Sequence, residues 1–142
     1  MNEKIKHPTE KHTLQNEILE LISRHQEGGY WDFKKQWYEH NNKGKNDLLH
    51  DIICMANNLY SRDAYIIIGI DEEKDYSVVG VNNDKNRKNT QNIIDFLKDK
   101  KFAGDVRPST LVETICIENK IIDVIIIKNS YDTPFYLKES KG

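Results

Sequence analysis

The chain has 142 residues, of which 37% are hydrophobic and 31% charged, and its formal net charge is −2 at pH 7. This size and balance are typical of one soluble globular domain with a highly charged surface. The charge excludes a uniformly basic protein, so any nucleic-acid surface must come from local clusters of basic residues. No apolar run of membrane-spanning length and no signal-peptide pattern is present, which favours a cytoplasmic protein without a membrane partner. Cys54 and Cys116 lie in apolar segments without metal-type spacing, and we expect buried free thiols there.

The N-terminal part of the sequence predicts an arm, two helices and a strand. Residues 1–12 are polar and are expected to form a flexible arm, followed by a single domain over 13–142. Thr13 can cap a helix over residues 13–26, and Asn46 can cap a second helix over residues 46–60 with a broad apolar stripe. Between them, residues 30–37 alternate as a strand, with an apolar face of Trp31, Phe33 and Trp37 and a polar face of Asp32, Lys34 and Gln36.

Residues 64–81 are expected to form the centre of the fold. Residues 65–69 are a nearly continuous apolar run, which is typical of a strand buried on both faces. The run ends in Asp71, and a charged turn leads to a second strand-like run over residues 76–81, so the segment predicts a hairpin. We expect four isoleucines to be buried in the core: Ile52, Ile66, Ile68 and Ile125.

The C-terminal half predicts a third helix and a second hairpin. The helix starts at Asn89 or Thr90 and covers residues 90–102, and the strands 111–117 and 120–128 flank a turn at Glu118 and Asn119. A short last strand is expected over residues 135–138. The order of elements predicts an α/β (α+β) fold, in which a mixed β-sheet with two hairpins is packed with about three helices.

Three carboxylates fall at the ends or on the polar faces of these elements. Glu27 follows the first helix, Asp32 lies on the polar face of the first strand, and Asp71 follows the buried strand. If the two strands are neighbours, the three acids converge and offer the oxygen ligands that Mg²⁺ or Mn²⁺ needs. Lys34 lies two residues beyond Asp32, hence on the same face, where a cation can stabilise charge on a reacting phosphate. The alternative is that these acids are solvated or cap nearby turns.

Basic residues with interleaved aromatic residues are a second candidate site. Phosphate binding needs cations, and single strands need aromatic rings for stacking. We choose two clusters as candidate nucleic-acid contacts: Lys34 with Lys35, and Lys85 with Arg87 and Lys88. The alternative is that these basic side chains simply cover helix surfaces.

The order of several short motifs resembles the Schlafen/AlbA-type domain family over residues 27–136. The acidic residue followed by an acid-Phe-Lys strand corresponds to Glu27 and residues 32–34, and a helix ending in Ala-Asn corresponds to Ala56 and Asn57. The strand closing on Gly-aliphatic-Asp corresponds to residues 69–71, and it is followed by Val-Gly-Val at 79–81. The later steps correspond to Arg107-Pro108 and Thr133-Pro134-Phe135.

The resemblance implies a nucleic-acid-binding domain. In animal Schlafen proteins, domains of this type are endoribonucleases with three metal-binding acids, and those positions match Glu27, Asp32 and Asp71. The resemblance therefore implies a metal-dependent nuclease acting on RNA or DNA, with Lys34 in the same catalytic site. A non-catalytic module that binds DNA or another protein and regulates transcription is the alternative. A nucleotide-binding domain is a third, because prokaryotic members carry such labels.

The sequence also departs from the family pattern. Residues 57–63 replace the usual Asn-Thr-x-Gly-Gly, and Asp32 stands where Glu is more frequent. The family pattern continues into a further strand, whereas this sequence ends at Gly142. The resemblance therefore implies an N-terminal piece of a longer protein, with a fused C-terminal domain or a second copy of the chain as further candidate partners.

Overall fold

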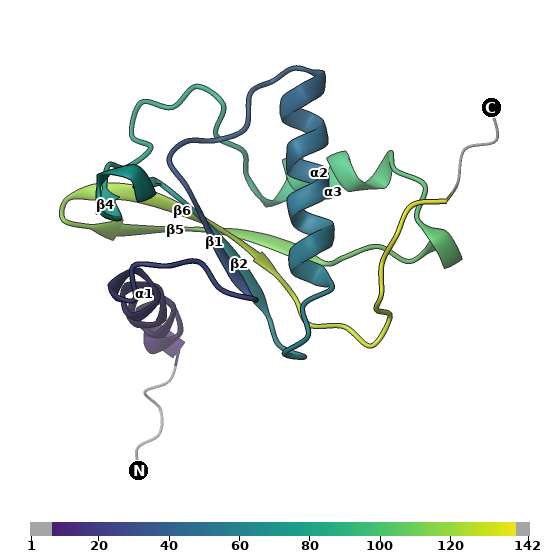
Figure 1. The fold of residues 1–142 in the computed structure, drawn as a ribbon, viewed down its shortest axis with the longest axis horizontal. Helices are drawn as coiled ribbons and strands as arrows, with labels where there is room; N and C mark the ends of the chain where they lie inside the picture. The colour runs from purple at the N-terminus through teal and green to yellow at the C-terminus, as the bar shows by residue number, and fades with distance from the viewer. Residues whose placement is uncertain (1–6, 139–142) are drawn as a thin grey trace, which may run out of the picture.

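The computed structural model describes residues 7–138, and side chains from residue 13 onward. A four-stranded sheet lies between α2 and α3 on one face and α1 on the other (Figure 1). The helices are α1 (His7–Ser23), α2 (Asn42–Ala56) and α3 (Thr90–Lys98). The strands are β1 (Trp31–Lys34), β2 (Ala64–Ile68), β3 (Ile70–Asp71), β4 (Ser77–Val78), β5 (Thr110–Ile117) and β6 (Lys120–Ile127).

The main sheet is mixed, as predicted, with the strand order β1-β2-β6-β5. β1 and β2 are parallel, while β6 is antiparallel to both β2 and β5. Helix α2 is the crossover that parallel neighbours require. The predicted β5–β6 hairpin is confirmed, and its turn residues Glu118 and Asn119 have φ values of 53° and 64°. β1 is an edge strand beside β2, so the first strand and the buried strand are neighbours. The predicted convergence of the acids required this arrangement.

The hairpin predicted within residues 64–81 is smaller than expected. Gly69 has φ 120°, a backbone conformation that residues with a side chain rarely adopt, and β2 ends before it. The backbone oxygen of Gly69 accepts hydrogen bonds from the amides of Val79 and Gly80, at 2.8 and 2.9 Å. β3 and β4 therefore form a separate two-stranded sheet, in which Ile70 pairs with Val78.

The hydrophobic core has one cluster on each face of the sheet. Ile52, Ile66, Ile68 and Ile125 have no exposed area, which confirms the prediction for all four. Trp31 and Phe33 pack with α1, as a common strand face requires. Trp37, which we expected on that face, packs with α2 and α3 instead because β1 ends at Lys34 and the alternation stops there.

Other boundaries differ from the predictions. α1 begins before Thr13, and α2 begins at Asn42 with Asn41 as its cap, because the Asn41 side chain accepts from the amide of Gly44 at 2.8 Å. Residues 135–138 form no strand; Leu137 only makes an isolated bridge with Phe102. Residues 1–6 of the predicted arm lie outside the described residues.

The expectation of buried thiols is wrong. Cys54 and Cys116 are both exposed, because Cys54 lies beside the apolar stripe of α2 and Cys116 points away from the core between Ile115 and Ile117. Within residues 7–138, no helix has the length and apolar character needed to cross a membrane.

Candidate functional site

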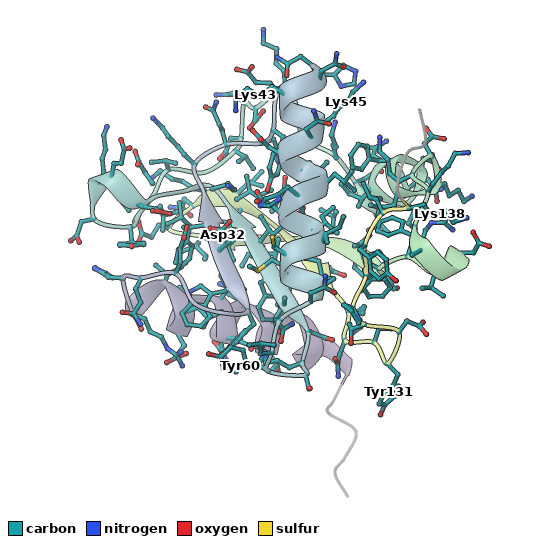
Figure 2. All side chains as sticks on the ribbon, turned by 45° about the vertical axis from the view of Figure 1, so that its right-hand side comes forward. Asp32, Lys43, Lys45, Tyr60, Tyr131 and Lys138 are labelled. Carbon is teal, nitrogen blue, oxygen red and sulfur yellow. The ribbon has the colours of Figure 1, made fainter. Side chains whose placement is uncertain are left out.

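The edge strand β1 presents Asp32 and Lys34 to the side of the sheet covered by α2. These residues pair with Ile66 and Ile68, which belong to the cluster under α2. Figure 2 shows Asp32 on this strand beside the helix. The Lys34 ammonium lies 3.6 Å from Oδ2 of Asp32 and 3.1 Å from Oδ2 of Asp51, which comes from α2. Lys34 therefore connects the strand acid to a helix acid.

Three carboxylates converge at this edge: Glu27, Asp32 and Glu72. Each offers an oxygen, and these oxygens all lie within 4.8 Å of one another. Glu27 follows α1 directly before Gly28, and Glu72 is the first residue of a short 3₁₀ turn (Glu72–Lys74) after β3. Asp32 is half-buried, whereas Glu27 and Glu72 are exposed. The site therefore combines two exposed glutamates, whose side chains are longer, with one aspartate whose backbone belongs to a strand.

The pKa of Glu27 is raised by its surroundings in this acidic site. A hydrogen bond with the Asp32 carboxyl, partial burial and the nearby Glu72 carboxylate raise this pKa from 4.5 to about 9. Such a hydrogen bond requires one proton between the two carboxyl groups. Without a bound cation, the acidic site therefore holds a proton at neutral pH.

Lys34 keeps its positive charge in this environment. Burial lowers its pKa, but the charges of Asp32 and Asp51 more than offset that effect, and the net pKa lies above its ordinary value. Tyr38 donates a hydrogen bond to Asp51 at 2.7 Å, and burial together with the Asp51 charge raises the pKa of Tyr38. The tyrosine hydroxyl therefore stays protonated and holds Asp51 toward Lys34.

Asp71, the third acid predicted from the sequence, does not belong to the converging group. Its side chain is buried and accepts a hydrogen bond from the amide of Glu73 at 3.0 Å, which caps the 3₁₀ turn. Its other oxygen lies 3.8 Å from the Lys35 ammonium. The structure thus brings together Glu27 and Asp32, as expected from the sequence, and adds Glu72.

The predicted nucleic-acid contacts differ in their surroundings. Arg87 makes a bidentate contact with the buried Asp123, at 2.8 and 2.9 Å, and is therefore already engaged. Trp37 and Thr114 also donate to Asp123, at 2.8 and 2.6 Å. Lys85 is exposed on the loop after β4. Lys88 lines a hollow of about 280 Å³ between α2 and α3, while Lys35 lines a different hollow together with Asp71 and Glu72.

Sequence reasoning missed Glu72, Asp51 and Tyr38. A signal for Glu72 existed in the run of charges after Asp71, but strand alternation could not choose between neighbours once Gly69 interrupted the strand. Asp51 flanks the apolar stripe of α2, which suits a surface residue equally well. Its role depends on where α2 crosses β1, and that crossing is a tertiary feature.

These features define an α+β domain with an acidic site at the edge of a mixed sheet. The sequence model of the family described as Schlafen, AlbA_2 matches residues 27–142, and the chain belongs to this family. Membership supports a nucleic-acid-related domain. A search of curated proteins found no match.

A solved structure has a similar fold. The crystal structure of the DIP2311 protein from Corynebacterium diphtheriae matches with a TM-score of 0.50 and 14% sequence identity. The match covers 88% of this chain and 24% of that protein, so this chain spans less than a quarter of its length. At this identity the likeness concerns the fold alone.

Proposed function

We propose that this domain binds nucleic acid and hydrolyses phosphodiester bonds with a divalent cation, Mg²⁺ or Mn²⁺, held by Glu27, Asp32 and Glu72. The observation that carries the proposal is the convergence of these three carboxylates beside Lys34. Carboxylates at such separations repel one another unless a cation or a shared proton offsets their charge. The hydrogen bond between Glu27 and Asp32, which with partial burial raises the pKa of Glu27, supplies such a shared proton when no cation is bound. Nucleic acid as the substrate class follows from the family.

The donor set fits a hard cation. Mg²⁺ prefers oxygen ligands at about 2.0–2.1 Å in an octahedron, so neighbouring ligand oxygens lie about 3 Å apart. The three carboxylate oxygens are within 4.8 Å of one another, and the two glutamates are exposed, so small side-chain rotations suffice. Three protein ligands would also leave positions for water and a phosphate oxygen.

The chain's own residues would divide the work around the phosphate. A bound divalent cation supplies charge neutralisation at the phosphate and lowers the pKa of water. Asp32 is fixed by β1, so it sets the position of the site relative to the sheet. Lys34 is charged and one-third exposed, so it can donate a hydrogen bond to a non-bridging phosphate oxygen. In the reaction a water oxygen bonds to phosphorus, and the P–O ester bond to the leaving sugar oxygen breaks.

The test compares Asp32→Asn with Asp99→Asn on labelled single-stranded RNA and DNA in Mn²⁺. Losing a ligand should slow cleavage at least about 100-fold, since a metal supplies several kcal/mol of transition-state stabilisation. Asp32→Asn should keep the fold, because the amide has the same shape and reduces the charge repulsion. Asp99 is exposed at the end of α3, and its substitution should leave the rate within about twofold.

Two outcomes would contradict the proposal. Equal cleavage by Asp32→Asn and the unsubstituted chain would remove Asp32 from the reaction. Binding of oligonucleotides without cleavage by the unsubstituted chain would favour a non-catalytic regulatory module instead.

A further inference from the structure

A polar pocket of about 590 Å³ lies beyond the end of β1, and none of the features above accounts for it. Lys35 and Lys120 line it, together with asparagines of the loop that follows β4. Figure 1 shows β4 and this loop beside the turn between β5 and β6, and the amide of Val81 donates to the Ile121 oxygen at 2.8 Å. We call this pocket of about 590 Å³ the lysine pocket. Its volume lies in the range of ligand pockets, about 300–1,000 Å³.

Lys35 connects the lysine pocket to the acidic site. A second hollow of about 310 Å³ is lined by Lys34, Lys35, Asp71 and Glu72, and it shares Lys35 with the lysine pocket. Glu72 is also one of the three converging carboxylates. A continuous surface therefore runs from the acids, past Lys35, to Lys120.

The charges along this surface change from one end to the other. The end with Asp32 and Glu72 is acidic and suits a cation, Lys35 lies between the two hollows, and the far end carries Lys120. The carboxylate that lines the lysine pocket, Asp84, accepts hydrogen bonds from the amides of Trp37 and Asn86, both at 2.8 Å. Lys35 also lies 3.8 Å from Oδ2 of Asp71, so the positive charge that this wall offers to a phosphate comes mainly from Lys120.

The wall of the lysine pocket is held in place by its backbone. Gly80 has φ 78°, and a Cβ there would lie 2.9 Å from Cβ of Lys120, so the wall is packed closely. The Asn82 side chain accepts from the amide of Ile121 at 3.1 Å. Within the described residues, the side chains of Asn83 and Asn86 have no hydrogen-bond partner, although both line the pocket. Their amides offer both a donor and an acceptor, as base edges require.

We propose that the lysine pocket binds one nucleotide of a single-stranded polynucleotide, the nucleotide next to the phosphodiester held at the acidic site. Lys35 and Lys120 contact its phosphate, and Asn83 and Asn86 contact the edge of its base. A base enters such a pocket only when it is not paired in a duplex, which specifies a single strand. The position relative to the cleaved bond rests on the proposed function, whereas the binding of a nucleotide does not.

The experiment measures anisotropy of short fluorescein-labelled homopolymeric RNA and DNA oligonucleotides, with Asp32→Asn as the background so that the probe stays intact. Lys120→Gln should weaken binding about tenfold and reduce the salt slope by about 0.7, as for one lost phosphate contact on a single strand. Lys98→Gln, an exposed lysine in the last turn of α3, is the control with the same charge change and should leave both values unaltered. Asn86→Ala should instead reduce the difference in affinity between oligonucleotides of different base.

The outcomes separate the two proposals. Equal effects of Lys120→Gln and Lys98→Gln would overturn the nucleotide pocket, whatever the cleavage assay gives. Binding that depends on Lys120, without cleavage by the unsubstituted chain, would overturn the nuclease proposal and keep the pocket. Absence of binding to every probe at low salt would overturn both. Thermal melting of each variant establishes that a loss of binding is not a loss of folding.

Discussion

Glu27 is the side chain whose protonation depends most directly on whether the acidic site holds a cation. Its carboxyl shares a hydrogen bond with Asp32 and lies near Glu72, and its pKa is raised to about 9. A cation bound among these oxygens would displace the shared proton, because a coordinating carboxylate must be ionised. Affinity for the cation should therefore increase with pH.

The same proton predicts how stability varies with pH when the cation is removed. The unfolded Glu27 ionises near its ordinary value of 4.5, whereas the folded one holds its proton up to about pH 9. The stabilising contribution is fully present below the lower value and is lost as the pH rises through the higher one. In EDTA, the melting temperature should fall between about pH 5 and pH 9, and Glu27→Gln should flatten that decline. An unchanged decline in Glu27→Gln would show that other groups cause it.

Among the individual site residues, the sequence predicted those whose positions depend on a single strand. Asp32 and Lys34 are two positions apart, so strand geometry alone puts them on one face, as observed. It could not choose between Asp71 and Glu72, because the conformation of Gly69 decides which of them faces Asp32. The sequence also could not show that Arg87 binds Asp123, because 36 residues separate the two.

The elements were easier to predict than their ends. The apolar run of β2, the stripe of α2 and the β5–β6 turn all reflect local patterns, and all three elements are present. The start of α2 was misplaced because Asn41 and Asn46 are equally good caps by residue type. The single hairpin expected at residues 64–81 is divided between two sheets, because one residue with positive φ redirects the chain.

Asn57, which follows α2 and is one of the residues that carry the family resemblance, binds the backbone of Phe135 in the C-terminal segment. Its side chain donates to the Phe135 oxygen at 2.8 Å and accepts from the Phe135 amide at 2.7 Å. Phe135 is buried, so both backbone groups would lose their partner in Asn57→Ala. This variant should lower the free energy of unfolding by about 1–3 kcal/mol, measured by urea denaturation.

A matched control lies in the same helix. Asn46 is exposed within α2, and Asn46→Ala should change the free energy of unfolding by less than about 0.5 kcal/mol. Equal effects of the two substitutions would mean that the contact between Asn57 and Phe135 does not hold the C-terminal segment.

For the whole molecule, the net charge of −2 conceals a separation of charge along one edge. The acids gather where β1 meets the turn after β3, and lysines line the pocket beyond it. The mixed α+β architecture followed from the order of helices and strands. The juxtaposition of an acidic site with a lysine pocket did not, because it requires the loop after β4 to lie beside the start of β6.

The most direct test of the account is Mn²⁺ binding, followed by electron paramagnetic resonance, in the unsubstituted chain, Glu72→Gln and Asp71→Asn. We predict one bound Mn²⁺ per chain, a loss of affinity of at least about 100-fold in Glu72→Gln, and affinity within a few-fold of the original in Asp71→Asn. The second substitution is mild because an amide oxygen can still accept from the Glu73 backbone. Absence of Mn²⁺ binding, or loss in Asp71→Asn with retention in Glu72→Gln, would contradict the site described here.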